Sequence, residues 1–254
     1  MIGEKVGMKT ILLKFSGPLQ SWGTSSHFEI RHTDKYPSKS AVVGLIAAAL
    51  GYRRNEDEKI RELGHIHYAV RIDQTGHVVD DYQTVHKYRY TPEKTLDRTY
   101  VTHREYIEDA VFVVAIGSDD ITLVDKILQA LQNPYFQLSE GRRSCPLMVD
   151  CFIGNSDTDV ISALKEVSWQ ASEWYQKKGK WGKKNDNTEG SVVLEIIADA
   201  DLLPEGKPAS LRRDVPLSFS NKGRRYSYRN ERRIQVTIKT GLSAKTEHDA
   251  FGII

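Results

Sequence analysis

Runs of apolar residues along the chain predict a mixed α+β protein. Residues 110–117 are almost continuously apolar, which is typical of a buried strand, and residues 9–15 form a second, short apolar strand candidate. Residues 39–50 are apolar nearly all round, so we expect a helix buried against a sheet. Ser38 is placed to cap the start of this helix, and Gly51 to end it.

Weaker patterns complete the order of elements. They predict helices at residues 55–63, 121–131 and 161–169 and strands at residues 191–198 and 234–239. Residues 65–73 and 77–85 alternate as strands, and the turn sequence DQTG predicts that they pair as a hairpin. The order strand, helix, strand, strand, strand, helix is close to a ferredoxin-like split βαβ unit.

A polar, basic and tyrosine-rich insertion at residues 87–109 predicts a hairpin that projects from the domain. The periodic pattern weakens further along, which divides the chain into a first domain at residues 1–147 and a second part at residues 148–254. Residues 177–188, rich in Lys, Gly and Asn, are expected to form a mobile loop.

The composition is that of an ordinary globular protein, with 39% hydrophobic and 28% charged residues and a net charge of +2. No apolar run is long enough for a transmembrane helix, and the first residues make a poor signal peptide, so we expect a cytoplasmic protein. Cys145 and Cys151 form neither a disulfide framework nor a zinc pattern and are interpreted as core thiols.

The segment YPSKS raises the question of a phosphate-binding loop. A Walker A loop wraps phosphate with backbone N–H groups, but Pro37 has none to give, so the NTPase interpretation fails. A helix N-terminus with Ser38, Lys39 and Ser40 still suits the phosphate of a polymer or ligand.

The loop before that helix carries both aromatic and cationic side chains, as single-stranded nucleic acid requires. They are Gln20, Trp22, Arg31, His32, Lys35 and Tyr36. A structural interpretation stays open, in which Ser38 only caps the helix, Lys39 is solvated and Trp22 packs under the loop.

Positive charge is concentrated near the C-terminus. Residues 211–233 carry net +6 while the remainder of the chain is acidic by 4. Within NKGRRYSYR, Arg224 and Arg225 alternate with tyrosines, which suits phosphates and bases, although a solvated loop is the alternative. Arg142 and Arg143 follow a glycine in SEGRRSCP.

Enzyme signals are weak. His65 and His67 share a strand face, but no carboxylate or cysteine completes a metal site, and we expect no metal or cofactor. Metal-free RNA cleavage needs a general base and a cation at the phosphate. The residue types for it are present at His27, His32, Lys35 and Tyr36.

Three sequence blocks carry a family resemblance. The stretch LKFSGPLQSWGTSSHFEIRHTDKYPSKSAVVGLIAAALG, then LSEGRRSCP, then RRDVPLSFSNKGRRYSYR resemble the CasD family of type I-E CRISPR Cascade subunits in order and spacing. The resemblance implies a RAMP-type fold, with an RRM-like (ferredoxin-like) domain, a projecting thumb at about residues 87–109 and a smaller β-rich C-terminal part.

The same resemblance implies a non-catalytic subunit that binds the 5′ handle of the CRISPR RNA and caps that end. Its partners would be the Cascade backbone subunit and the large PAM-recognising subunit, with target DNA reached only through the complex and no membrane. Two alternatives remain open. One is a metal-independent endoribonuclease acting on CRISPR repeat RNA, as in the type I-C relative, and the other is a free-standing RNA-binding regulator.

The two lines of reasoning together assign roles to residues. We expect Gln20 and Trp22 to contact bases, and Ser38, Lys39 and Ser40 to contact phosphate with help from Arg31 and Lys35. The thumb residues Tyr88, Arg89 and Arg98 are expected to brace the RNA where handle and guide meet. Arg142, Arg143, Arg224 and Arg225 are expected to clamp its backbone, although Arg142 and Arg143 could instead order the fold through carboxylates.

Overall fold

The computed structural model describes residues 7–24, 29–91, 94–182, 191–206 and 208–240, and of residues 87–91, 94–98 and 178–182 it describes the backbone alone. The predicted C-terminal tail and most of the predicted loop at 177–188 lie outside these ranges.

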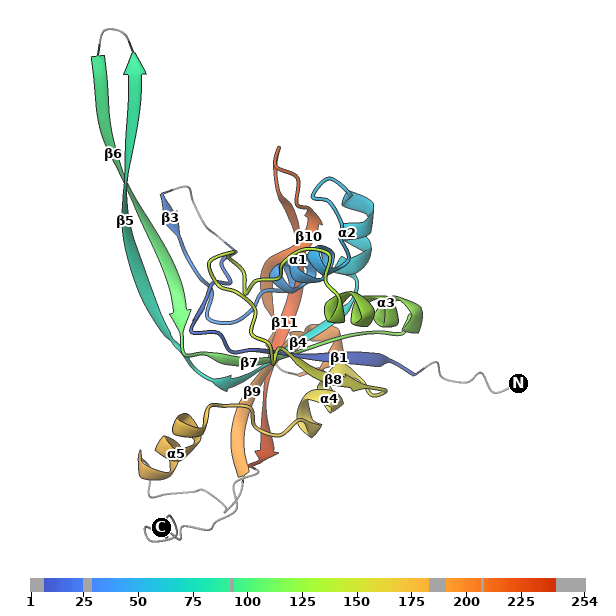
Figure 1. Cartoon of the computed structure of the whole chain (residues 1–254). Coiled ribbons are helices and arrows are strands. Elements are labelled where there is room, and N and C mark those ends of the chain that lie inside the picture. Colours follow the sequence, from blue (N-terminus) through green and yellow to red (C-terminus); the bar gives the residue numbers. More distant parts are fainter. Residues whose placement is uncertain (1–6, 25–28, 92–93, 183–190, 207, 241–254) are drawn as a thin grey trace, which may run out of the picture.

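An antiparallel seven-stranded sheet organises the chain, in the order β10-β11-β9-β4-β7-β1-β8 (Figure 1). Its strands are β1 (Lys9–Phe15), β4 (His67–Gln74), β7 (Val111–Ser118), β8 (Phe152–Ser156), β9 (Ser191–Asp199), β10 (Ser210–Ser218) and β11 (Arg225–Lys239). Four neighbours, β8-β1-β7-β4, reproduce the ferredoxin-like order. The predicted α+β fold class is therefore confirmed.

The helices are α1 (Lys39–Ala49), α2 (Asp57–Gly64), α3 (Ile121–Gln132), α4 (Val160–Glu166) and α5 (Glu173–Gly182), with a 3-10 turn, η1, at Ala200–Leu202. α1 begins as predicted, because the Ser38 side chain accepts the N–H of Ala41. Gly51 follows the helix at φ +75°, where a side chain would be strained.

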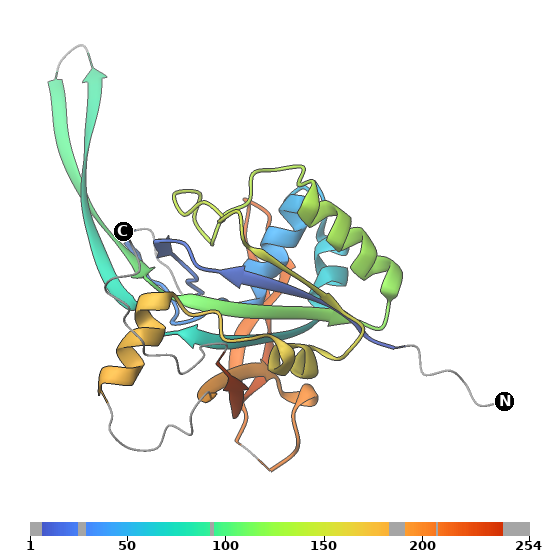
Figure 2. The same ribbon diagram turned by 60° about the horizontal axis from the view of Figure 1, so that its bottom comes forward.

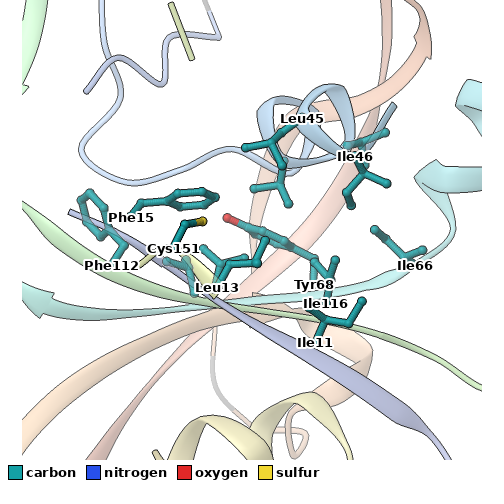
Figure 3. Close-up of a cluster of buried hydrophobic side chains, with 14 of the residues drawn as sticks. Ile11, Leu13, Phe15, Leu45, Ile46, Ile66, Tyr68, Phe112, Ile116 and Cys151 are labelled. Carbon is teal, nitrogen blue, oxygen red and sulfur yellow. The ribbon is translucent and has the colours of Figure 1, made fainter. Parts of the chain in front are cut away.

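Two apolar layers flank the sheet. Helices α1 and α3 cover one face, with side chains such as Ile46 and Val124 packed onto the strands, and α4 covers the other (Figures 1 and 2). Figure 3 shows part of the first layer, where Leu45 and Ile46 of α1 point down toward Tyr68, and Phe15 and Phe112 lie to one side on the strands. Cys151 belongs to this core, and burial raises its thiol pKa to about 12, as expected for a structural cysteine.

The C-terminal strands continue the same sheet. β8 completes the ferredoxin-like unit, whereas β9, β11 and β10 extend the sheet beyond β4. Strands from both sides of the boundary that we placed at residue 147 are therefore hydrogen-bonded into one sheet.

The thumb is longer than predicted. β5 (His77–Thr91) and β6 (Lys94–Glu108) pair along their whole length and project away from the sheet (Figures 1 and 2). The predicted hairpin of residues 65–73 with 77–85 is wrong, because β4 already has β7 and β9 on its two edges. Gly76 lets the chain leave β4, since a Cβ there would lie 2.3 Å from the carbonyl oxygen of Glu108.

Two short strands fix the base of the thumb. β2 (Leu19–Gln20) pairs antiparallel with the end of β6, and β3 (Ile30–Arg31) pairs parallel with β6 at His103 and Arg104. The loop between β1 and α1, which carries the GPLQSWG motif, is thereby attached to the thumb rather than free.

A buried network of charges joins the start of α1 to the C-terminal strands. Arg229 donates to Asp199, Asp214 and Glu231 at 2.7–3.0 Å. Burial alone would lower the pKa of Arg229, but the hydrogen bond and charge of Asp214 raise it above its ordinary value. Lys39 belongs to the same network, because its ammonium donates to Asp199 at 3.0 Å.

This network corrects the phosphate assignment at the start of α1. Lys39 is only 5% exposed, and its backbone N–H donates to the carboxylate of Asp214 at 2.9 Å. Asp214 thus occupies the position at the helix N-terminus where the sequence predicted a phosphate. Ser38 is buried as the cap and its hydroxyl bonds that of Ser40, so neither hydroxyl extends a free phosphate site.

The loop holding Glu140 is locked against the GPLQSWG loop. The Glu140 carboxyl accepts the backbone N–H groups of Ser16 and Gly17 at 3.3 and 3.2 Å, and its backbone carbonyl accepts the N–H of Ser21. Gly141 has φ +88°, and a Cβ there would lie 1.7 Å from the Ser21 carbonyl oxygen. The sequence motifs GPLQSW and EGRRSCP are therefore two halves of one packed unit.

We expect Lys39→Ala to destabilise the fold. Asp199 would lose one of its buried cationic partners, at a cost of about 2–4 kcal/mol in the free energy of unfolding, measured by urea denaturation. Lys35→Ala is the matched control, because Lys35 is exposed four residues away and should change stability by less than about 0.5 kcal/mol. Equal stability of the two variants would contradict the ion network.

Glu140 should make the stability fall with rising pH. Burial is the main cause that raises its pKa from 4.5 to about 7, so the folded chain holds this proton more tightly than the unfolded chain. Its contribution is fully present below about pH 4.5 and is lost as the pH rises to about 7.

The measurement is the free energy of unfolding of wild type and Glu140→Gln at pH values from about 5 to about 8, a range that spans the folded-state pKa of about 7. The amide cannot ionise, so the difference between the two proteins should shrink or reverse toward the alkaline end, by up to about 3 kcal/mol. Parallel pH profiles would show that Glu140 does not titrate in this window.

Candidate nucleic-acid interface

Gln20 and Trp22 lie inside the protein. The Gln20 amide donates to the carbonyl of Ala110 at 2.8 Å and accepts the indole N–H of Trp22 at 2.9 Å. Trp22 packs on Phe15 with ring centroids 5.0 Å apart, and the two motif residues are 0% and 1% exposed. The expectation that they contact bases is corrected, and the structural interpretation of Trp22 is the one that the fold supports.

Cationic side chains gather at the base of the thumb instead. Arg31 is exposed on β3, and Arg143 is exposed on the turn between Glu140 and Cys145. Arg142 lies between them, donating to the carbonyl of Arg31 at 2.7 Å and stacking over the ring of Tyr106 at 4.7 Å. The structure thus brings together predicted residues from two distant motifs.

Arg104 is a residue of the basic insertion to which the sequence analysis assigned no role. It lies on β6 beside Arg31 in the ladder, and in the described part of the chain its Nε has no hydrogen-bond partner. Asp81 stands opposite Arg104 on β5, but its carboxylate accepts the amide of Gln83. The missed signal was the alternation of Tyr100, Thr102, Arg104 and Tyr106, which places all four on one face of a strand.

Three of these residues form a group that we call the thumb-base cluster, namely Thr102, Arg104 and Arg142. Each has a buried side-chain polar atom without a partner: the Thr102 hydroxyl oxygen, Arg104 Nε and Arg142 Nη1. Among the described residues only Asp57 and Arg232 have another such atom.

The opposite face of the thumb is partly acidic. Glu105 accepts His32 Nδ1 at 3.0 Å and the N–H of Thr33 at 3.1 Å. Burial opposes ionisation, but these two hydrogen bonds lower the pKa of Glu105. His103 binds Asp80 at 2.7 Å on the same face. Glu105 and Asp80 thus lie on one face of the hairpin, and Arg104 and Asp81 lie on the other.

Other predicted residues lie away from the thumb base or outside the description. Arg224 and Arg225 are at the turn between β10 and β11, where Arg225 pairs with Asp57 of α2 at 3.1 Å (Figure 1). Lys35 is exposed near β3. The backbones of Tyr88, Arg89 and Arg98 lie in the outer thumb, but their side chains are outside the described residues.

The basic C-terminal segment is a hairpin whose charge is divided between interior and surface. Arg212 and Arg229 face inward, where Arg212 bonds Asp34 at 3.0 Å and stacks on Tyr36 at 4.2 Å. Arg213 and Arg224 remain exposed. The alternation of a strand, rather than the total charge, decides which arginines reach the surface.

Of the residues named for RNA cleavage, Tyr36 and His32 are hydrogen-bonded to carboxylates within the described chain. The hydroxyl of Tyr36 donates to Glu231 in the interior, and burial raises its pKa to about 12. His32 is bound to Glu105, and His27 lies outside the described residues.

Within the described chain, no helix is long and apolar enough to cross a membrane.

Comparisons with known proteins agree on one family. Residues 10–232 match the family model described as CRISPR-associated protein (Cas_Cas5). The CRISPR system Cascade subunit CasD of Escherichia coli (strain K12) is 33% identical over an alignment of 188 residues, with 68% of this chain and 83% of that protein covered.

Solved structures give the same result. A chain of a CRISPR RNA-guided surveillance complex matches with a TM-score of 0.73 and 30% identity, covering 94% of this chain and 95% of that chain. A structure titled "Crystal structure of Cas protein" matches with a TM-score of 0.61 and 27% identity, covering 91% and 98%. The resemblance in the three sequence blocks is confirmed, and the chain belongs to the CRISPR-associated Cas5 family.

Proposed function

We propose that this chain is a non-catalytic subunit of a cytoplasmic CRISPR Cascade complex, in which it binds the 5′ handle of the CRISPR RNA and caps that end. Membership of the Cas5 family supports this proposal, as do the names of two similar proteins, a Cascade subunit and a chain of an RNA-guided surveillance complex.

The observation that carries the RNA-binding part is the unneutralised positive charge at the thumb base. Arg31 and Arg143 are exposed there, Lys35 is exposed four residues after Arg31, and among the described residues Arg104 Nε has no hydrogen-bond partner. Guanidinium groups pair with phosphate oxygens in planar, two-pronged contacts. Such contacts position a strand without reading it, so recognition of a fixed handle sequence also requires contacts to base edges.

The thumb itself supports assembly with protein partners. Above β3 it is a two-stranded hairpin, which is marginally stable in isolation. It exposes Val78, Tyr82, Val85 and Tyr100, apolar surface that a neighbour would cover. In this proposal the neighbour is the Cascade backbone subunit, the large PAM-recognising subunit contacts the same end, and target DNA is reached only through the complex.

The test combines binding and cleavage in one incubation. The purified chain is mixed with labelled CRISPR repeat RNA and with its 5′-handle fragment in EDTA, then run on native and denaturing gels. We expect a shift of the handle fragment with the RNA intact. A discrete cut that His32→Ala or Lys35→Ala abolishes would overturn the non-catalytic assignment in favour of a metal-independent endoribonuclease.

A charge-matched pair of variants locates the binding surface. The triple variant Arg31→Ala/Lys35→Ala/Arg143→Ala should weaken handle binding by about tenfold or more and flatten its salt dependence. The control Lys165→Ala/Lys177→Ala/Lys222→Ala removes the same charge from exposed positions on other surfaces and should bind like wild type. Equal weakening by both variants would mean that only net charge matters.

A further inference from the structure

Aromatic and cationic side chains meet at the C-terminal end of α1, where the chains that follow α1 and α3 come together. Helices α2 and α3, which flank this place, lie on the side of the domain away from the thumb (Figures 1 and 2). We call the group the α1-end cluster, namely Tyr52, Arg53, Arg54, Lys126, Tyr135 and Phe136.

The fold presents the ring of Tyr135 to solvent. The backbone N–H of Tyr135 donates to the carbonyl of Ala49 at 2.9 Å, and the next N–H donates to that of Ala48 at 3.2 Å, so this segment is fixed against the end of α1. The ring lies against Gly51, where a Cβ would be 2.8 Å from the Tyr135 Cγ. Tyr135 is still 67% exposed. Its ring is therefore held on one side and open on the other.

Cations flank the rings of the cluster. The Arg53 guanidinium carbon lies 5.0 Å from the centroid of the Phe136 ring and 5.9 Å from that of Tyr135. The Lys126 ammonium lies 5.5 Å from the Tyr52 centroid and donates to the hydroxyl of that tyrosine at 3.0 Å. Both cationic side chains are exposed, so they have N–H groups left for a ligand.

The chain does not neutralise these charges with ion pairs. Carboxylates adjacent in sequence are already paired with other cations, in the pairs Glu56–Lys59, Asp57–Arg225 and Asp125–Lys9. Arg54 donates to a neutral partner, the amide oxygen of Asn221, at 2.8 Å. Glu58 and Glu62 are exposed on α2, and within the described chain they form no ion pair with a cation of the cluster. The cluster therefore keeps positive charge that an anion can bind.

The combination of groups indicates the chemistry of the ligand. Guanidinium and ammonium groups without a carboxylate partner suit phosphate oxygens. An open aromatic ring suits the face of an unstacked base, which an intact duplex does not offer. An acidic peptide would satisfy the cations but would leave the Tyr135 ring without a flat partner. The observations thus favour a single-stranded nucleic acid over a duplex and over an acidic protein segment.

We propose that the α1-end cluster is a second nucleic-acid site, which binds a single strand with a base on Tyr135 and phosphates on Arg53, Arg54 and Lys126. This site goes beyond the proposed function, because the 5′ handle is assigned to the thumb base. A strand of DNA and a stretch of RNA outside the handle both carry the phosphates and bases that the cluster requires.

Competition with the handle tests whether the site is separate. The purified chain is saturated with unlabelled 5′-handle RNA, and a fluorescein-labelled oligothymidine or oligouridine is then titrated with anisotropy as the readout. We expect a labelled strand to bind the occupied chain, and the tighter of the two names the source. Complete exclusion of both labelled strands by the handle would overturn the second site.

Tyr135 separates stacking from charge. Tyr135→Leu keeps an apolar side chain against Gly51 but removes the ring, and should weaken strand binding by about five- to tenfold. Tyr135→Trp keeps a ring and should bind at least as tightly as wild type. Tyr228→Leu is the matched control, because Tyr228 on β11 is 58% exposed with Arg213 6.0 Å from its ring but lies outside the cluster. Unchanged affinity in Tyr135→Leu, or an equal loss in the control, would contradict stacking at this site.

A second pair of variants tests the charges. Arg53→Gln/Lys126→Gln should flatten the slope of log affinity against log salt by about one, since each phosphate contact of a single strand contributes roughly 0.7. Handle binding should not change in this variant. The thumb variant Arg31→Ala/Lys35→Ala/Arg143→Ala should do the reverse and lose the handle while keeping the labelled strand. Displacement of the strand by polyglutamate at equal charge would assign the cluster to an acidic protein segment and overturn the proposal.

The outcomes keep this site and the proposed function apart. If the cluster variants bind the labelled strand like wild type while the handle still binds, the α1-end assignment falls and the proposed function stands. If the chain binds the strand through the cluster but does not bind the handle, the proposed function falls and the α1-end assignment stands.

Discussion

The buried network centred on Arg229 is the constraint on which the remainder of the structure depends. One guanidinium is bonded to Asp199, Asp214 and Glu231, and these carboxylates in turn bind the ammonium and backbone N–H of Lys39 and the hydroxyl of Tyr36. Charges taken out of water are tolerated only when paired and hydrogen-bonded, so each member requires the others. The network therefore fixes where the β10–β11 hairpin meets α1. The position of α1 in turn fixes one end of the loop that runs from β1 past the thumb to α1.

Local sequence patterns predicted helices and strands well where a single physical rule, such as capping or burial, decided the local structure. The Ser38 cap, the apolar helix behind it and the continuous strand around Val113 follow from propensity and burial, and each was found. Pairing was harder to predict. The DQTG turn is a sound hairpin signal, but it says nothing about whether the strand before it already has two neighbours. β4 has both, so β5 pairs with β6 instead, and Gly76 marks a change of sheet rather than a tight turn.

The site shows the same limit more sharply. Trp22, Lys39 and Arg229 belong to the residue types that bind RNA, and all three are buried in structural roles, because a sequence does not reveal which carboxylate or carbonyl will meet a side chain. Arg31, Arg142 and Arg143 were expected to bind RNA, and what brings Arg31 and Arg142 together at the thumb is the pairing of β3 with β6, which the sequence does not show. Arg104 belongs to the basic insertion but was given no role of its own, because the lack of a partner at its Nε is visible only in three dimensions.

The wide separation of the network's members along the chain has a consequence for biosynthesis. Lys39 and Tyr36 emerge from the ribosome long before Asp199 and Glu231, their partners 160 and 195 residues further along. Until β9 and β11 have been made, the side chains of Lys39 and Tyr36 have no partners in the positions where the native fold buries them. Folding of the ferredoxin-like half at that stage would leave the Lys39 ammonium at the start of α1 without an acceptor. Because long-range contacts of this kind are made last and slowly, completion of the N-terminal half waits for nearly the whole polypeptide. A chain cut short before β11 thus loses the support of its first helix along with its last strand.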